Sequence, residues 1–167
     1  MPGRHYTFTR VTPQDLPMIR AWLEEPHVRR WWGDPAEQIA LIAGDLDEPT
    51  MGCYLAAFEG RPFAYVQWWL THPYSVYLDQ PAGTRGIDPF IGVPEMLGKG
   101  HGAGLVGAFA RELLADGANR VIIDPDPHNL QAIRAYAKAG FRPLGERETS
   151  DGRVLLMAID NSEAEPC

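Results

Sequence analysis

The chain has 167 residues, 45% of them hydrophobic and 22% charged, which is the size and composition of one folded domain with a sizeable core. Its formal net charge is −7, so the basic surface that nucleic-acid binding requires is not expected. An acidic surface suits a cationic substrate, although many enzymes are acidic without that reason.

The sequence points to a reducing compartment. No apolar run reaches the length of a membrane helix, and the first ten residues lack the apolar segment of a secretion signal. Cys53 and Cys167 lie far apart, so neither a disulfide framework nor a metal site is expected. We therefore predict a cytoplasmic protein with no metal, no nucleic-acid partner and no membrane partner, present as a monomer or homodimer.

The first third of the chain predicts a strand and two helices. Residues 6–11 alternate as a strand does, and Thr12-Pro13-Gln14-Asp15 is typical of a helix start. The apolar positions of this helix follow at helical spacing, and Pro26 lies just past its end. Asp34-Pro35-Ala36-Glu37 repeats the start signal, and residues 28–33 between the two helices contain Trp31 and Trp32.

The middle of the chain predicts strands and a long loop. Residues 53–58 and 62–70 read as a hairpin joined at Glu59-Gly60-Arg61. Residues 71–83 read as a loop, and long loops in compact domains are often functional. Residues 84–93 contain a buried strand that Pro89 interrupts, which implies an edge, a bulge or a splayed partner.

The last part alternates helices and strands. We expect a glycine-rich loop and helix over residues 98–116, a strand over 120–123 and a helix over 129–139 that Asn129 can cap and Gly140 ends. Strands over 141–147 and 154–159 surround a turn at Ser150-Asp151-Gly152. This order predicts one mixed α/β domain with a core over about residues 6–159 and a short acidic tail at 160–167.

The glycine-rich loop, residues 97–105, predicts an anion site. Glycines let a ligand approach the backbone, and free N–H groups at a helix start favour phosphate. Coenzyme A pyrophosphate fits such a loop, and Lys99 adds positive charge. His101 and His128 read as surface residues. The alternatives are a dinucleotide, whose glycine pattern begins too late here, a P-loop nucleotide, which lacks Ser or Thr after Lys99, and a helix merely packed closely on a sheet.

A second motif follows about thirty residues on. Asn129, Ala132, Tyr136 and Gly140-Phe141 come after a strand and Asp124-Pro125. Together with the loop, this pattern resembles the GNAT superfamily of N-acetyltransferases, although Leu97 stands where many members have Arg or Gln. The resemblance implies a single domain whose central, mostly antiparallel, twisted sheet of about six or seven strands is splayed in the middle and flanked by about four helices. It also implies acetyl-CoA as co-substrate.

Within that superfamily the chain is most similar to aminoglycoside 6′-N-acetyltransferases. The matching pieces are Trp31-Trp32-Gly33, Tyr65 with Gln67, Arg85-Gly86-Ile87-Asp88, Leu97-Gly98-Lys99-Gly100 and the segment from Asp124 to Phe141. The resemblance implies a cationic amine substrate bound by Trp32, Tyr65, Gln67, Asp79, Asp88 and Asp124, with Asp79 out of register. It implies that acetyl-CoA is bound by Phe90, Ile91, Lys99, Gly100, His101, Gly102, Ala103, Gly104, Asn129 and Tyr136.

The chemistry requires a base, because an ammonium group cannot attack a thioester. Asp88 is the first candidate, as base or as substrate anchor, and a strand N–H near Phe90 or Ile91 is a candidate oxyanion donor. By family analogy, Tyr136 protonates the departing thiolate, unless it is only a core tyrosine. Cys53 reads as core, so the expected reaction is direct transfer in a ternary complex.

We therefore predict an acetyl-CoA-dependent N-acetyltransferase that acts on a primary amine, with the aminoglycoside 6′-amine first. An acceptor that is lysine-like, a siderophore precursor or a protein amine is the alternative within the fold. A non-catalytic acyl-CoA-binding module is the alternative from another class, and it would show no turnover.

Overall fold

The computed structural model describes residues 4–72 and 76–161. Its tertiary contacts divide them into two compact units. Unit 1 holds the described residues up to Trp68 together with Pro89–His101, and unit 2 holds Trp69–Asp88 and the described residues from Gly102 onward. The seven strands of the described chain form one sheet in the order β1-β2-β3-β4-β5-β7-β6. The family resemblance implied one sheet of about six or seven strands.

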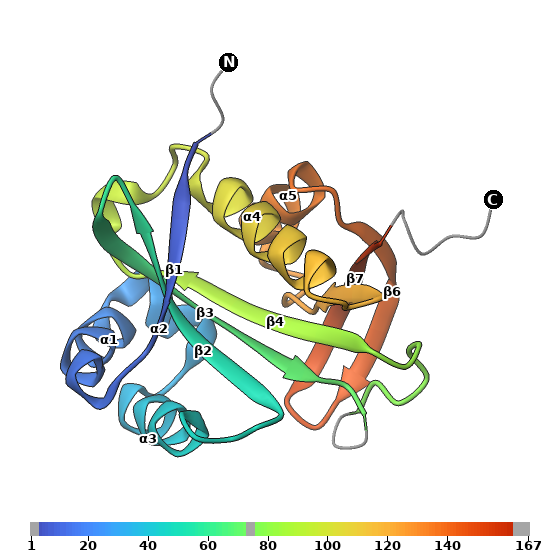
Figure 1. Cartoon of the computed structure of the whole chain (residues 1–167), viewed down its shortest axis with the longest axis horizontal. Coiled ribbons are helices and arrows are strands. Elements are labelled where there is room, and N and C mark those ends of the chain that lie inside the picture. Colours follow the sequence, from blue (N-terminus) through green and yellow to red (C-terminus); the bar gives the residue numbers. More distant parts are fainter. Residues whose placement is uncertain (1–3, 73–75, 162–167) are drawn as a thin grey trace. The chain divides into compact units, whose positions relative to one another are not determined.

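Unit 1 joins strands β1 and β2 to three helices. Strands β1 (Tyr6–Arg10) and β2 (Met51–Phe58) pair antiparallel, from Tyr6 with Phe58 to Arg10 with Tyr54. A 3-10 turn, Pro13–Asp15, precedes α1 (Leu16–Glu24), and α1 packs on α2 (Pro26–Trp32) and α3 (Pro35–Asp45) (Figure 1). The helices cover a cluster of buried side chains that includes Ile19, Trp22, Ile42, Cys53 and Tyr65.

One helix of unit 1 was not expected. The sequence predicts a connection over residues 28–33, because Pro26 reads as the stop of the preceding helix. The structure begins α2 at Pro26, with Glu25 extended before it at φ −61° and ψ 132°. A proline ends one helix and also suits the first position of the next, where its missing N–H is not needed. The described chain therefore has five α-helices rather than about four.

Two strands contribute residues to both units. β3 (Arg61–Leu70) follows β2 through a turn at Glu59 and Gly60, both with positive φ. β4 (Thr84–Ile91) pairs in parallel with β5 (Arg120–Ile123) from Thr84 with Arg120 to Gly86 with Ile122. The pairing therefore covers only the start of β4, ahead of Pro89, which has no N–H to donate to a ladder.

Unit 2 continues the sheet with an antiparallel hairpin. β5 pairs with β7 (Gly152–Asp160), and β7 pairs with β6 (Arg142–Thr149), with an irregularity between Pro143 and Gly145. Two helices lie beyond the 3-10 turn Pro94–Met96 in the chain (Figure 1). Helix α4 (His101–Ala115) follows this turn, and helix α5 (Leu130–Lys138) follows strand β5. Residues 73–75 of the expected loop, and residues 162–167 of the expected tail with Cys167, lie outside the described residues.

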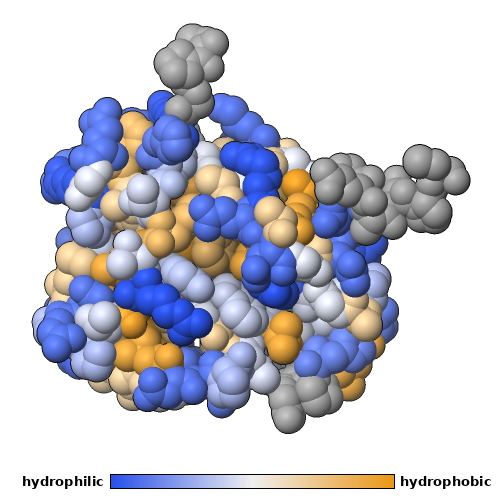
Figure 2. All heavy atoms as spheres, viewed as in Figure 1, coloured by the Kyte–Doolittle hydropathy of each residue, from blue (hydrophilic) through white to orange (hydrophobic). Residues whose placement is uncertain are grey.

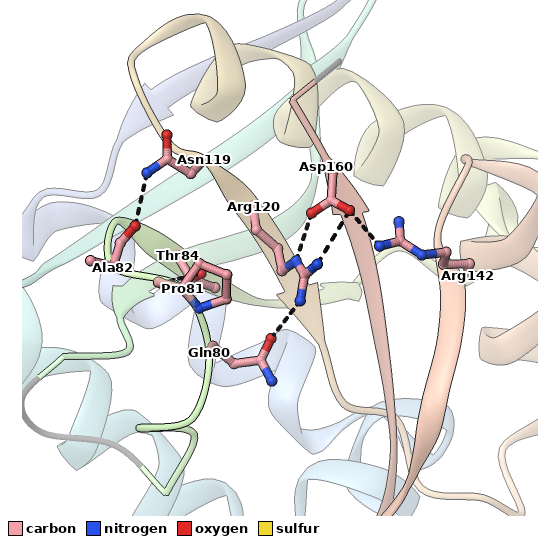
Figure 3. Close-up of polar contacts among 8 residues, drawn as sticks. All are labelled: Gln80, Pro81, Ala82, Thr84, Asn119, Arg120, Arg142 and Asp160. Atoms are coloured by element: carbon pink, nitrogen blue, oxygen red, sulfur yellow. Dashed lines mark hydrogen bonds and ion pairs between the residues drawn. The ribbon is translucent and has the colours of Figure 1, made fainter. Parts of the chain in front are cut away.

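A polar network in unit 2 holds the loop that follows β3. The Arg120 guanidinium donates to both Asp160 oxygens, at 2.6 and 3.3 Å, and to Gln80 Oε1 at 3.0 Å (Figure 3). Arg142 donates to the same Asp160 carboxylate, and this lowers the pKa of Asp160 together with Arg120, the larger cause. Asn119 donates to Ala82 O at 2.8 Å. The loop backbone is thereby tied to strands β5 and β7.

Large exposed hydrophobic side chains come from several different elements. On the face drawn in Figure 2, hydrophobic residues lie in small groups among hydrophilic ones. Scattered apolar residues of this kind are ordinary on a folded protein. The exposed large hydrophobics are Trp31, Leu41, Val76, Leu78, Leu130 and Leu144.

Candidate active site

The main feature of unit 2 is a pair of carboxylates, one on strand β4 and the other directly after strand β5. The last pair of the β4–β5 ladder joins Gly86 to Ile122, and Asp88 and Asp124 each lie two residues further on. Neighbouring strands are about 4.8 Å apart, and side chains two residues apart point to the same face. Asp88 and Asp124 therefore start from adjacent backbone positions, at the carboxyl ends of the paired segments, where ligands of open α/β sheets gather.

The two carboxylates do not ionise independently. Burial of Asp124, followed by the charge of Asp88, raises the pKa of Asp124 to about 7, although a hydrogen bond from Tyr77 acts in the opposite direction. A pKa near 7 leaves Asp124 about half protonated at neutral pH, so the pair carries between one and two negative charges. Such a pair attracts a cation, and a carboxylate with a raised pKa is a better base.

Each carboxylate accepts a hydrogen bond from an aromatic side chain. Trp69 Nε1 donates to Asp88 Oδ2 at 2.9 Å, and the Tyr77 hydroxyl donates to Asp124 Oδ2 at 2.7 Å. The Trp69 and Tyr77 rings are stacked, with centroids 6.0 Å apart and planes at 24°. Neither Trp69 nor Tyr77 was among the residues predicted from the sequence. Tyr65 and Gln67 came from the family resemblance, and the two-residue alternation of a strand extends from them to Trp69.

Tyr136 belongs to the same group of side chains. It is partly buried on α5, and burial, then Asp88, then Asp124 raise its pKa. Its hydroxyl therefore stays protonated at neutral pH, as a proton donor must. Asn129 caps this helix as expected, since its Oδ1 accepts the Ala132 N–H at 3.3 Å.

The structure gives Asp79 a protein partner. Both carboxylate oxygens of Asp79 lie 2.8 Å from nitrogens of the Arg147 guanidinium, and this ion pair lowers the pKa of Asp79. The pair joins the loop after β3 to strand β6. Asp79 therefore serves first as an anchor of the loop, and its predicted contact with substrate would have to compete with Arg147.

In unit 1, four of the expected residues form one group. Trp32 lies against Phe90 and Tyr65, with ring centroids 4.9 and 6.3 Å apart, and Tyr65 lies 5.4 Å from Phe90. The Tyr65 hydroxyl donates to Gln67 Oε1 at 2.7 Å. Tyr65 is fully buried while Trp32 and Gln67 are partly exposed, so a ligand on this face would meet Trp32 and Gln67 before Tyr65.

The backbone of Ile91, an expected cofactor contact, is held by a histidine that the sequence analysis did not name. His27 Nε2 donates to Ile91 O at 2.8 Å, a bond that crosses 64 positions of sequence. The next two backbone N–H groups, of Gly92 and Val93, both donate to Phe63 O. These bonds fix the peptide planes at the end of β4, which a backbone oxyanion donor requires.

The glycine-rich loop has the conformation that an anion site needs. Gly98 and Gly100 have φ of 71° and 83°, in the region that favours glycine, and α4 begins directly afterwards at His101. The first N–H groups of a helix have no partner within it and point toward an anion. The Arg4 guanidinium donates to Lys99 O, so a second cation lies beside the exposed Lys99.

His101 is not the surface residue that the sequence analysis expected. It is buried, its Nδ1 lies 2.9 Å from the Tyr6 hydroxyl, and its ring packs on Phe58 and Phe63. Burial lowers its pKa. His101 stands four residues before Leu105 on the same helix, so helical spacing would have placed it on the buried stripe. Any contact of His101 with a cofactor is therefore left to its backbone. His128, by contrast, is exposed as expected.

Within residues 4–72 and 76–161, no three or more His, Cys, Asp or Glu side chains are grouped so that they could hold a metal ion. No helix in this part of the chain is both long and apolar enough to cross a membrane.

Comparison with known families agrees with the fold and these residues. The sequence model of the acetyltransferase (GNAT) domain matches residues 12–149, so the chain belongs to the GNAT family of acetyltransferases. It is an acetyl-CoA-dependent N-acetyltransferase by family.

The individual relatives include resistance enzymes. The aminoglycoside N(6′)-acetyltransferase type 1 of Klebsiella pneumoniae is 32% identical, over 90% of this chain and 81% of the relative. A crystal structure of AAC(6′)-Ib with coenzyme A and kanamycin is similar with a TM-score of 0.85 at 31% identity, over 93% of this chain and 95% of that one. The lysine N-acyltransferase MbtK of Mycolicibacterium paratuberculosis is 28% identical, over 87% of this chain and 69% of the relative.

Proposed function

We propose that this protein transfers the acetyl group of acetyl-CoA to a primary amine, by direct attack in a ternary complex, and that the 6′-amine of aminoglycosides is its acceptor. The observation that carries the proposal is the pair of carboxylates, Asp88 and Asp124, each two residues past the last pair of the parallel β4–β5 ladder. Aminoglycosides are polycations, and a partly buried pair of acidic side chains is complementary to them. Relatives with 32% identity act on these antibiotics by name.

Each residue of the group has a proposed role. Asp124 and Asp88 bind the ammonium form of the substrate, and Asp88 then accepts a proton from it, directly or through water. The neutral nitrogen attacks the thioester carbonyl, and a backbone N–H at Phe90 or Ile91 donates to the oxygen that becomes negative. Tyr136 donates its proton to the thiolate that leaves, and a bound cation beside Asp88 and Asp124 lowers the pKa of Tyr136 toward that task.

The co-substrate has its own proposed site. The backbone N–H groups of the loop from Gly98 to Gly104 bind the pyrophosphate of acetyl-CoA, and Lys99 supplies positive charge. The positive φ values of Gly98 and Gly100 support this proposal, because they turn successive peptide N–H groups toward one side. We propose that Asn129 adds a contact near the start of α5, and that Trp32 and Gln67 contact the sugar rings. The location is proposed to be the cytoplasm.

The proposal predicts turnover with aminoglycosides and its loss in one variant. Release of coenzyme A thiol from acetyl-CoA is measured with kanamycin, tobramycin, lysine and a buffer blank. Kanamycin and tobramycin should release thiol, and Asp88→Asn should reduce kcat by about a hundredfold or more, because a general base contributes that much. Acetyl-CoA should still raise the Tm of Asp88→Asn. Asp116→Asn, at an exposed aspartate paired with Arg85, is the control and should keep normal rates.

A second acceptor is tested by the same assay. Relatives named lysine N-acyltransferase, at 28% identity, favour a lysine-like amine. Thiol release with lysine and not with the aminoglycosides would overturn the proposed acceptor while leaving acetyl transfer in place. Stabilisation by acetyl-CoA with no turnover on any amine would favour a binding module.

A further inference from the structure

The carboxylate pair raises the question of what holds it in place, and the answer lies in the segment that follows β3. Resting on the function proposed above, we propose that Tyr77 and Trp69 are positioning residues, which hold the carboxylates of Asp124 and Asp88 in the orientation that receives the substrate ammonium group. The two aromatic residues themselves need not touch the substrate in this arrangement.

Tyr77 enters the core from a loop. Its neighbours Val76 and Leu78 are 64% and 52% exposed, whereas Tyr77 is 2% exposed. Its ring belongs to the buried cluster of Ile122 on β5 and Leu156 and Ala158 on β7. A loop residue rarely fills a core in this way, because loops run over the surface. The ring therefore fixes where the hydroxyl lies relative to Asp124.

The loop that holds Tyr77 is anchored to two strands of unit 2, β6 and β5. Two residues after Tyr77, Asp79 is paired with Arg147 of β6, and the next residue, Gln80, accepts from Arg120 of β5 (Figure 3). The Gln80 carbonyl oxygen also accepts a hydrogen bond from His72 Nε2 at 2.9 Å. These bonds leave the Tyr77 hydroxyl little freedom to move away from Asp124.

Trp69 is placed by a glycine. A Cβ added to Gly86 would lie 2.1 Å from Cζ2 of the Trp69 ring, so only glycine at this position of β4 admits the indole. The indole of Trp69 on β3 thus lies against Gly86, which stands two residues before Asp88 on β4, and it donates to Asp88 while its face stacks on Tyr77. Gly86 was predicted only as part of a segment that matches the family. The close approach of the Trp69 ring is the physical reason for a glycine at this position.

Both donors contact the Oδ2 atom of their carboxylate. One strong hydrogen bond to an ionised oxygen fixes the carboxylate plane and is worth more than a bond between neutral groups. A carboxylate has about four acceptor positions, so the bond from Trp69 or Tyr77 does not by itself saturate it. The Tyr77 hydroxyl also stabilises the ionised form of Asp124, which is the form that binds a cation.

A proton is exchanged when the cation binds. The groups that face Asp124 are Asp88 on β4, Tyr77 on the loop, Tyr136 on α5 and Asp151 at the β6–β7 turn, with Arg147 of β6 acting on Tyr77. The charges of Asp88 and Asp151 favour a proton on Asp124, whereas the hydrogen bond from Tyr77 favours its ionised form. When an ammonium group occupies the pair, protonated Asp124 loses its proton to solvent and the ammonium takes its place. The bond from Tyr77 decides how readily this exchange occurs.

The test is Tyr77→Phe, which keeps the buried ring and removes the donor. We expect KM for the amine to rise about tenfold near neutral pH, as for loss of a hydrogen bond to a charged group. The acid limb of kcat/KM should move upward by roughly one pH unit. The difference in KM for the amine between the two proteins should shrink at pH values above that limb, where Asp124 is ionised in both. KM for acetyl-CoA should stay within about twofold of the natural value. Tyr54→Phe, at a tyrosine of unit 1 whose ring lies beneath Arg10, is the matched control and should keep the normal pH profile.

A second readout needs no turnover, so it separates this inference from the proposed function. The ¹³C signal of the Asp124 carboxyl is followed against pH in the free protein. The midpoint should lie near pH 7 in the natural protein and higher in Tyr77→Phe. If Tyr77→Phe does not fold, ortho-fluorotyrosine in place of Tyr77 strengthens the donor and should lower the midpoint. Unchanged midpoints and an unchanged pH profile in these proteins would overturn the positioning role, whatever amine is acetylated.

Discussion

At the scale of single residues, the chemistry depends on where charge is placed rather than on which residue types are present. The chain has 22 aspartates and glutamates, but Asp124 differs because burial and Asp88 raise its pKa to about 7. Asp126, two residues away, has a lowered pKa because it accepts from the His128 N–H and side chain. The same residue type at nearly the same place in the chain thus has opposite shifts for identifiable reasons.

The raised pKa of Asp124 predicts a stability that depends on pH. In the unfolded chain the Asp pKa is near 3.9, so between about pH 4 and pH 7 the folded protein holds a proton that the unfolded chain has lost. The free energy of unfolding should therefore fall as pH rises through this range. Asp124→Asn cannot titrate, and it should show a shallower fall and a gain over the natural protein above about pH 7. Urea unfolding at several pH values measures this.

The control for that experiment is Asp47→Asn, which changes an exposed aspartate of unit 1 and should keep the slope of the natural protein. If the free energy of unfolding fell equally with pH in Asp124→Asn and the natural protein, the raised pKa of Asp124 would be contradicted. Tyr136 contributes nothing in this range, because its raised pKa lies above it.

The residues named from the sequence divide by how local their signal is. Asp88, Asp124 and Tyr136 were found from family motifs, and the structure brings their charges within range of one another. Tyr77 was not found, because nothing near it in sequence shows that its side chain turns into the core between two exposed neighbours. Its partner Asp124 is 47 positions away, and only the fold joins the two.

At the scale of elements, local signals were sufficient for most boundaries. The strand at Arg120–Ile123 has the predicted bounds, and the caps at Asp34 and Asn129 make the expected bonds to Glu37 N–H and Ala132 N–H. The helix at Pro26–Trp32 was missed because proline has two meanings, as a stop and as a first residue. The sheet order depends on contacts between distant segments, and the family resemblance implied only a single, mostly antiparallel sheet of about six or seven strands.

The glycine-rich loop predicts a separable effect on the co-substrate. Gly100 has a φ of 83°, so Gly100→Ala strains the loop and turns its N–H groups. KM for acetyl-CoA should rise about tenfold, with KM for the amine nearly unchanged, since a strain of one to two kcal/mol corresponds to that factor. Initial rates at varied acetyl-CoA measure it.

Gly60→Ala is the matched control, because Gly60 has a similar φ of 79° in the β2–β3 turn and space around it for a Cβ. It should cost similar stability without altering KM for acetyl-CoA. Equal values of KM for acetyl-CoA in the two variants would mean that Gly100 matters for folding alone.

At the scale of the whole molecule, each unit presents one part of the proposed chemistry. Unit 1 holds the aromatic group around Trp32 and the loop glycines Gly98 and Gly100, and unit 2 holds the carboxylate pair with Tyr136. The net charge of −7 suits a polycationic substrate but could not have identified one, since charge acts over the entire surface. The acceptor was inferred from the resemblance, because no residue spacing encodes which amine of an aminoglycoside reaches the thioester.

The most direct measurement of the central claim is the position of the acetyl group on the product. Kanamycin is incubated with acetyl-CoA and the protein, and the product is analysed by mass spectrometry and two-dimensional NMR. The account predicts a product with a single added acetyl group on the 6′-nitrogen, formed by the natural protein and nearly absent with Asp88→Asn. Acetylation at another nitrogen, or unmodified kanamycin beside an acetylated lysine-like amine, would contradict it.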